Sequence, residues 1–213
     1  MLSVLMPSLC NLVDNDYSSI KNDETEALIQ SMLQGLKGVK TPTLLQVSGI
    51  PGAGKSTYCK AHQLQNYLYI SFDKIMISLQ SYKEDLQNYG EVKAFTNNEM
   101  KARIIGYELL NRALTLHYNI MLEHSGTNDA HIELFKNIKS QGYQTSINFI
   151  VCNTSLAIKR AKVREKETKR HVPETLIKER ADKFNFYLNQ YQGIVEKINI
   201  LDGANNFSLL KKI

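Results

Sequence analysis

The sequence predicts an α/β fold with a mostly parallel sheet and helices on both of its faces. From residue 43 onward, short apolar segments typical of buried strands alternate with longer segments of helical periodicity. Hydrophobic residues make up 43% and charged residues 22% of the 213 residues, which is usual for a globular protein with a buried core. At one domain per roughly 150 residues, this length favours a single domain with insertions. No apolar run approaches the ~18 residues of a membrane-spanning helix, so we expect no membrane association.

An N-terminal arm is predicted at residues 1–24, followed by one domain at residues 25–213. Residues 11–24 are polar and rich in turn-forming residues, so we expect this part of the arm to be flexible. From Thr25 to Leu36, apolar residues recur every four positions, and glycines lie at the end of this stretch. This spacing predicts the first helix of the domain, ended by the glycines.

The strands of the sheet are predicted from short, largely apolar segments with turn-forming residues at their boundaries. They are residues 43–48, 67–71, 118–122, 146–151 and 197–201. Apolar stripes of helical spacing lie at residues 102–116, 132–138 and 177–191. Pro173 and Glu174 mark the start of the last of these helices, because a proline and an acidic residue are both favoured in a first turn. Helices between consecutive strands imply parallel pairing.

The most specific motif lies directly after the first predicted strand. It fits the pattern G-x-x-x-x-G-K-[ST] and consists of Gly49, Ile50, Pro51, Gly52, Ala53, Gly54, Lys55, Ser56 and Thr57. In such a loop the backbone N–H groups converge on phosphates, and the following helix directs its positive end to the same anion. Lys55 is expected to reach the β- and γ-phosphates, and the Ser56 hydroxyl to coordinate Mg²⁺. The motif predicts a P-loop NTPase fold that binds ATP or GTP with Mg²⁺.

Two carboxylates are expected near this loop, because both follow predicted strands at the carboxyl edge of the sheet. Asp73 can take the proton of an acceptor hydroxyl, or it can serve as a helix N-cap. Glu123 fits a magnesium shell, an acceptor contact or an exposed loop position. Ser125 and Thr127 follow it and offer hydroxyls to a polar acceptor.

A basic segment follows the fourth predicted strand. Its cations are Lys159, Arg160, Lys162, Arg164, Lys166, Lys169 and Arg170. We expect a helix here that Ser155 caps, and a lid at about residues 154–172 that neutralises charge as a phosphoryl group is transferred. The alternative is a solvated helix face whose acidic neighbours balance the charge.

Taken in order, these segments resemble the zeta-toxin family of P-loop kinases. The matching stretches, from about Leu44 to about Arg180, are SGIPGAGKST, ISFD, NIMLEHSGT, GYQTSINFIVCNTSLAIKRAKVRE and KRHVP. The resemblance implies that Lys55 binds nucleotide phosphates, that Asp73 is the base and that Glu123 contacts the acceptor. It also implies two lid arginines that stabilise the transferring group, at Arg160 and Arg170. The best-known members phosphorylate a hydroxyl of a UDP-activated amino sugar, and an antitoxin or other inhibitory protein is the implied partner.

The chain departs from this family after Glu123. The family typically has a glycine, a threonine and then an arginine that helps to hold the acceptor, whereas here His124 and Ser125 follow, and Thr127 stands at the place of the arginine. The missing cation argues against a diphosphate-linked acceptor. The spacing of the lid arginines also differs, which leaves Arg164 as an alternative to Arg160.

Three other functions remain open on sequence alone. A 5′-hydroxyl polynucleotide kinase has a similar loop, but it usually carries an arginine where this chain has Met76. A nucleotide-hydrolysing protein would show an N-K-x-D guanine motif or a clear Walker-B aspartate, and the third predicted strand ends in Glu123 instead. The last alternative is a nucleotide-binding protein without catalysis.

Charge and cysteine usage add weaker expectations. Lys and Arg number 26 against 21 Asp and Glu, a formal charge of +5 that suits a nucleotide but is equally explained by solubility. The 3 cysteines are widely spaced and the 5 histidines share no ligand spacing, so we expect no disulfide framework or zinc site. A cytoplasmic location is expected, with export to another cell left open, and nucleic acid is not an expected partner.

Overall fold

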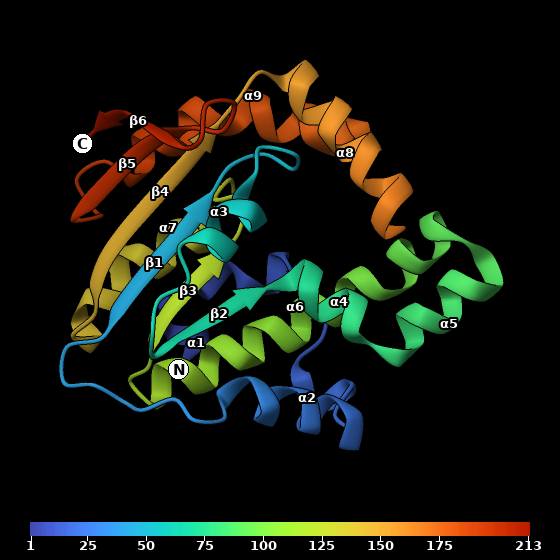
Figure 1. Cartoon of the computed structure of the whole chain (residues 1–213). Coiled ribbons are helices and arrows are strands. Elements are labelled where there is room, and N and C mark those ends of the chain that lie inside the picture. The colour runs from blue at the N-terminus through green and yellow to red at the C-terminus, as the bar shows by residue number, and fades with distance from the viewer.

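The computed structural model describes residues 1–213 and has helices on both faces of one six-stranded sheet (Figure 1). The strands are β1 (Thr43–Ser48), β2 (Tyr67–Ser71), β3 (Asn119–Glu123), β4 (Gln144–Val151), β5 (Lys197–Asp202) and β6 (Ser208–Lys212). The α-helices are α1 (Leu2–Leu5), α2 (Asp23–Leu33), α3 (Lys55–Ala61), α4 (Phe72–Ser78), α5 (Gln80–Tyr89), α6 (Glu91–Thr115), α7 (Asp129–Asn137), α8 (Thr154–Thr168) and α9 (Glu174–Tyr191). Three short 3₁₀ helices are η1 (Pro7–Asn11), η2 (Tyr17–Ser19) and η3 (Ile138–Gln141).

The sheet has the strand order β2-β3-β1-β4-β5-β6, with β1 between β3 and β4. Leu44 of β1 lies opposite Ile120 of β3 and Thr145 of β4, and these pairings are parallel. The predicted mostly parallel sheet is therefore confirmed, and all five predicted strands occur. β6 was not predicted, and it pairs antiparallel with β5. The carboxyl ends of β1 to β5 meet at one edge of the sheet, where ligands of such folds bind.

Side chains on the two faces of β1 belong to two separate core layers. Leu44 packs in the larger layer with Ile105 of α6 and Phe135 of α7. Val47 packs in the smaller layer, which includes Ala157 of α8. Because both faces of the central strand are buried, its sequence reads as a nearly continuous apolar run. The predicted arrangement of helices on both faces is confirmed.

The expected flexible arm is instead folded onto the domain. Leu2, Leu5 and Met6 are buried in the larger core layer. Other apolar side chains of the segment pack against the same layer: Leu9, Leu12, Val13, Tyr17 and Ile20. Asp16 caps η2 by accepting a hydrogen bond of 2.9 Å from the Ser18 N–H. These apolar residues have neither helical nor strand spacing, and residues 11–24 are mostly polar. Their packing against the core was therefore not predictable from the sequence.

The basic segment after β4 forms α8, which crosses the carboxyl edge of the sheet (Figure 1). Its N-cap is Asn153 rather than the expected Ser155, because the Asn153 side chain accepts a hydrogen bond of 2.8 Å from the Ser155 N–H. The far end of α8 reaches the α5–α6 corner. There the Tyr82 hydroxyl donates to the Lys169 carbonyl at 3.1 Å, and the Lys169 ammonium pairs with Glu91 at 3.3 Å. None of the helices combines the length and apolar character needed to cross a membrane.

Candidate active site

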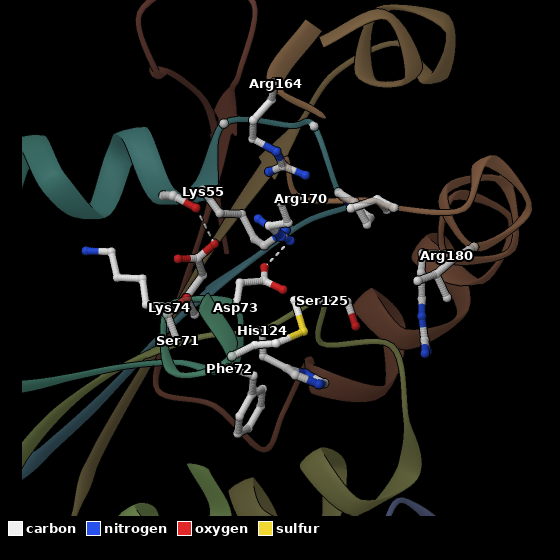
Figure 2. A pocket seen from close by; sticks show the side chains of 18 of the residues that line it. Lys55, Ser71, Phe72, Asp73, Lys74, His124, Ser125, Arg164, Arg170 and Arg180 are labelled. Atoms are coloured by element: carbon white, nitrogen blue, oxygen red, sulfur yellow. Dashed lines mark hydrogen bonds and ion pairs between the residues drawn. The ribbon is translucent and has the colours of Figure 1, made fainter. Parts of the chain in front are cut away.

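A cavity of about 750 Å³ lies at the carboxyl edge of the sheet. Its walls come from the P-loop after β1, the start of α4, the middle of α6, the loop after β3, parts of α8 and α9, and the loop between β5 and β6. Figure 2 shows Lys55, Asp73, Arg164 and Arg170 pointing toward one another in this cavity. Segments more than 100 residues apart in the chain thus supply one site, since Lys55 and Arg164 share it.

The P-loop presents part of its predicted nucleotide-binding set to the cavity. The residues that line it are Pro51, Gly52, Gly54, Lys55, Ser56 and Thr57. Gly49, Ile50 and Ala53 lie behind this surface. The Lys55 ammonium donates hydrogen bonds to the carbonyls of Gly49 at 2.9 Å and Ile50 at 3.2 Å. Burial lowers the pKa of Lys55, while the nearby Glu123 and Asp73 carboxylates oppose that shift.

Gly52 is required where the P-loop touches α8. Its φ of +86° lies in the left-handed region, and a Cβ built there would be 2.1 Å from the carbonyl oxygen of Ala157. No other residue type can occupy such a close backbone approach without moving one of the two segments. Helix α8 is consequently packed directly on the P-loop.

Glu123 lies beside the predicted metal ligand. Its carboxylate accepts one hydrogen bond from the Ser56 hydroxyl at 2.7 Å and a second from the Tyr69 hydroxyl. Burial, together with the charge of Glu123, raises the pKa of Tyr69, so this phenol stays protonated and remains a donor. A serine hydroxyl and a carboxylate side by side are oxygen ligands of the kind that Mg²⁺ uses next to nucleotide phosphates.

Asp73 is the second residue of α4 and lies in its first turn. The N-cap residue of this helix is Ser71. The alternative role of Asp73 as an N-cap is therefore wrong. Its carboxylate forms an ion pair with the Arg170 guanidinium, and its side chain is 36% exposed. This exposed fraction faces the cavity, so Asp73 is held in place and still accessible.

The basic helix directs one particular arginine into the cavity. The Nε and Nη2 atoms of Arg164 are buried and have no hydrogen-bond partner, and the same is true of Nε of Arg170. Burial and the neighbouring Arg170 lower the pKa of Arg164. Arg160 also lines the cavity, but it donates a hydrogen bond of 2.8 Å to the Gly203 carbonyl. Buried guanidinium donors without partners are costly unless an anion satisfies them, so the geometry of Arg164 fits a phosphate.

The predicted acceptor residues are only partly brought together. Ser125 lines the cavity, as Glu123 does. Thr127 is buried behind the wall, where its carbonyl and hydroxyl accept hydrogen bonds from Arg180 of α9 at 2.9 and 3.1 Å. Arg180 itself lines the cavity. A guanidinium from α9 thus lies beside the position where the sequence had indicated a missing cation.

Two stacked histidines support the wall of this part of the site. The rings of His124 and His131 are 3.7 Å apart, and His131 contacts Gln46 at 2.7 Å and Tyr107 at 3.1 Å. Burial, followed by the charge of Arg180, lowers the pKa of His131 to about 3. Burial and the charge of His131 lower the pKa of His124 well below its usual value. Both rings are therefore neutral, and Nδ1 of His124 accepts a hydrogen bond of 3.1 Å from the Gly126 N–H.

Two site residues were missed from the sequence. Tyr69 was read only as part of a strand, although its position two residues before the strand end places it on the same face as the P-loop helix. Arg180 was read only as the end of the matching region, because it follows the basic segment on a helix of ordinary composition. Its position on the cavity wall could have been inferred only if the packing of α9 against the loop after β3 had been known.

Comparison with known proteins identifies the family. Residues 27–212 match the zeta toxin family. This chain belongs to the zeta toxin family. It is 25% identical over 151 residues to Toxin zeta of Streptococcus pyogenes, which is 67% of this chain and 49% of that protein. It is 24% identical over 140 residues to Toxin zeta of Enterococcus hirae, which is 62% of this chain and 46% of that protein. The chain spans about half the length of these two relatives.

Solved structures share the fold of this zeta toxin family member. A structure from the PezAT chromosomal toxin–antitoxin system of Streptococcus pneumoniae superposes with a TM-score of 0.72 at 20% identity, covering 90% of this chain and 81% of that chain. An AvrRxo1-ORF1:ORF2 complex gives a TM-score of 0.68 at 10% identity, covering 88% and 65%. The same pair with ATP gives a TM-score of 0.59 at 10% identity, covering 89% and 61%. At these identities the likeness confirms the predicted fold, and the family match confirms the resemblance seen in the motifs.

Proposed function

We propose that this chain is a kinase that transfers the γ-phosphoryl group of ATP or GTP to a hydroxyl of a small-molecule acceptor. The observation that carries the proposal is the convergence of Lys55, Arg164 and Arg170 on the cavity that also holds Asp73. Three cations match the charge of a transferring phosphoryl group, and a carboxylate matches the proton of an attacking hydroxyl. Membership of the zeta toxin family supports the same class of reaction.

The proposed reaction begins with a rearrangement of contacts at the P-loop. Lys55 exchanges the carbonyls of Gly49 and Ile50 for oxygens of the β- and γ-phosphates. The free Nε and Nη2 of Arg164 contact the γ-phosphate, so their buried donors become satisfied. The acceptor hydroxyl binds to the Asp73 carboxylate, which receives its proton while the new O–P bond forms and the nucleoside diphosphate leaves.

Ser56 and Glu123 are the residues that we propose for Mg²⁺. When bound there, Mg²⁺ would supply positive charge that offsets the negative charge of the nucleotide phosphates. The hydrogen bond of 2.7 Å between Ser56 and Glu123 supports this proposal, because it places the two oxygens close enough to contact one small ion. This geometry supports Glu123 as a metal ligand more directly than as an acceptor contact, which was the role implied by the family resemblance.

We propose a UDP-amino sugar as the first acceptor to test and an antitoxin-like inhibitory protein as the partner. The acceptor follows from the family, and Ser125 of the predicted acceptor set lines the cavity, where its hydroxyl accepts a hydrogen bond of 3.1 Å from the Thr127 hydroxyl. Support for the partner comes from structures with this fold, which include a protein of the PezAT toxin–antitoxin system and the AvrRxo1-ORF1:ORF2 complex.

The proposed function can be tested by label transfer. The pure protein is incubated with Mg²⁺ and γ-labelled ATP, first with UDP-N-acetylglucosamine and then with a fractionated metabolite extract. We expect label on a small molecule. Label that appears only as inorganic phosphate would indicate a hydrolase, and label on the 5′ end of an oligonucleotide would indicate a polynucleotide kinase.

Lys55→Ala is the control for the nucleotide site in this experiment. We expect this variant to lose nucleotide affinity and label transfer together, because Lys55 contacts the phosphates before and during transfer. Lys60→Ala, which changes an exposed lysine of the same helix α3, should retain both. Unchanged ATP affinity in Lys55→Ala would contradict the P-loop assignment.

A further inference from the structure

Arg180 is a cationic cavity residue that the proposed phosphoryl transfer does not use. It reaches the cavity from α9; in the view of Figure 2, Lys55 and Arg164 lie above Asp73, whereas Arg180 lies to its right, with Ser125 drawn between Asp73 and Arg180. Lys55 and Arg164 mark the nucleotide side of the cavity. Arg180 therefore marks the side toward which an acceptor extends once its reacting hydroxyl binds to Asp73.

The Arg180 guanidinium is held in position with part of its donor capacity unused. Its Nη1 donates to the carbonyl and hydroxyl of Thr127, at 2.9 and 3.1 Å. No carboxylate oxygen lies within 4.0 Å of it, and its Nε and Nη2 donate no hydrogen bond to the protein. An arginine has five N–H donors in a rigid fork, and two anchored contacts leave the remaining donors oriented but free.

The charged surroundings of Arg180 favour an anion. Arg103 of α6 lines the same cavity, where it pairs with Glu99, so these two charges balance each other. Two further carboxylates lie nearby: Glu179 pairs with Lys183 at 2.8 Å on the exposed side of α9, and Asp129 accepts a hydrogen bond of 3.1 Å from the Tyr187 hydroxyl. The stacked histidines beside Arg180 are neutral. Arg180 consequently provides a positive charge at this end of the cavity that forms no ion pair within the protein.

We propose that Arg180 recognises an anionic group, a phosphate or a carboxylate, on the non-reacting part of the acceptor. The proposal rests on the proposed kinase function, because it assigns the acceptor side of the same cavity. Arg180 acts as a specificity-determining residue: it selects acceptors that carry a negative charge and takes no part in the transfer itself. A guanidinium fixed by a buried loop binds such a group in a defined orientation, because little side-chain freedom remains to be lost on binding.

Matched pairs of compounds test this assignment by calorimetry. The protein is titrated with N-acetylglucosamine and its 1-phosphate, and with ribose and ribose 5-phosphate, in the presence of Mg²⁺ and a non-hydrolysable ATP analogue and again without nucleotide. We expect at least one phosphate-bearing compound to bind about 10-fold or more tightly than its neutral partner, the scale of one hydrogen bond to a charged group. Arg180→Gln should remove this preference and leave the affinity for the neutral compound unchanged.

Two further variants separate recognition from a structural role. Lys183→Gln changes an exposed cation of the same helix and should keep the full preference. Arg180→Lys keeps the charge without the fork, so we expect an intermediate preference and a fold retained as judged by circular dichroism. The assignment is overturned if neither pair shows a preference in the wild-type protein. It is also overturned if Arg180→Gln keeps the preference or weakens both members of a pair equally.

The outcome of these titrations is independent of the outcome for the kinase proposal. Affinity for the ATP analogue should be the same in the wild-type protein and in Arg180→Gln, since Arg180 lies away from the P-loop. A wild-type protein that fails to bind the analogue contradicts the proposed function. The titrations without nucleotide still report whether Arg180 selects anionic compounds.

Discussion

Asp73 is the proposed base of phosphoryl transfer, because its carboxylate faces the cavity and is paired with Arg170. Asp73→Asn keeps the shape of the side chain but removes a base that can accept a proton. We expect this variant to fold, to bind MgATP normally and to lose transfer by about 10²-fold or more, the scale of general-base catalysis. Asp182→Asn, an exposed position on α9, is the matched control and should keep full activity. Full activity in Asp73→Asn would move the role of base to another residue, with Glu123 as the next candidate.

Two arginines of α8, one turn apart, allow the lid to be tested within one helix. Arg164 has buried donors without partners, whereas Arg160 is bonded to the Gly203 carbonyl. We expect Arg164→Ala and Arg170→Ala to slow turnover by about 10³-fold or more with little change in nucleotide affinity, because an arginine on the transferring group acts mainly in the transition state. Arg160→Ala should have a much smaller effect on turnover in the same steady-state assay. A larger loss of turnover in Arg160→Ala than in Arg164→Ala would identify Arg160 as the first lid arginine, which is the role that the family resemblance implies.

His131 makes the stability of the fold depend on pH in a defined range. Burial lowers its pKa to about 3 in the folded chain, whereas an unfolded histidine has a pKa of about 6.5. Below pH 6.5, His131 binds a proton in the unfolded chain but stays neutral in the folded chain. The free energy of unfolding therefore falls as the pH drops from about 6.5 toward 3. The free energy of unfolding, measured with urea at a series of pH values, should depend less steeply on pH for His131→Gln than for wild type. Equal slopes would mean that other groups account for the acid sensitivity.

At the scale of elements, the sequence predicted the parallel strands and missed the peripheral ones. β1 was predictable because both of its faces are buried, which leaves a recognisable run of apolar residues between Pro42 and Gly49. β6 is exposed along its whole length and carries Leu209 and Leu210 next to two lysines, so neither its composition nor its periodicity indicates a strand. Its pairing with β5 is a tertiary contact that local sequence does not encode.

The candidate site was predictable where a motif fixes the chemistry and unpredictable where only packing does. The P-loop, Asp73 and Glu123 all lie directly at strand ends, so their meeting followed from the parallel sheet alone. The choice between Arg160 and Arg164 depends on which face of α8 turns inward, and the basic residues surround that helix with no clear polar face. The position of Arg180 at the cavity depends on how α9 packs against the loop after β3, and no sequence motif indicates this packing.

The contact of α6 with α4 links the packing of Gly106 to the position of Asp73, the proposed base. A Cβ added to Gly106 of α6 would lie 2.2 Å from the ring of Phe72, the residue that precedes Asp73. Gly106→Ala should therefore displace Phe72 and reduce phosphoryl transfer by about 10- to 100-fold, since small misplacements of reacting groups are costly. Nucleotide affinity should stay near wild type. Lys93→Ala, an exposed position on the same helix, is the control, and equal activity in both variants would show that Phe72 adjusts without moving Asp73.

For the molecule as a whole, the N-terminal segment belongs to the same core as the sheet, and adjacent residues allow this to be measured. Leu5 is 1% exposed within the larger core layer, and its neighbour Val4 is 74% exposed. We expect Leu5→Ala to lower the free energy of unfolding by about 2–5 kcal/mol, as for other buried leucines. Val4→Ala should change it by less than about 0.5 kcal/mol. Similar values for the two variants in urea denaturation would show that the segment is detached in solution.

The central position of β1 has a consequence for the synthesis of the chain on the ribosome. β1 is bordered by β3 and β4, which are made long after it, and the cations Arg164, Arg170 and Arg180 follow later still. A nascent chain that has emerged only as far as β3 already carries the P-loop, Asp73, Glu123 and one neighbour of β1, yet it lacks β4, the second neighbour, and the arginines Arg164, Arg170 and Arg180. We expect such a chain to be inert toward nucleotide and acceptor alike. The proposed kinase site is therefore complete only after synthesis has proceeded past Arg180.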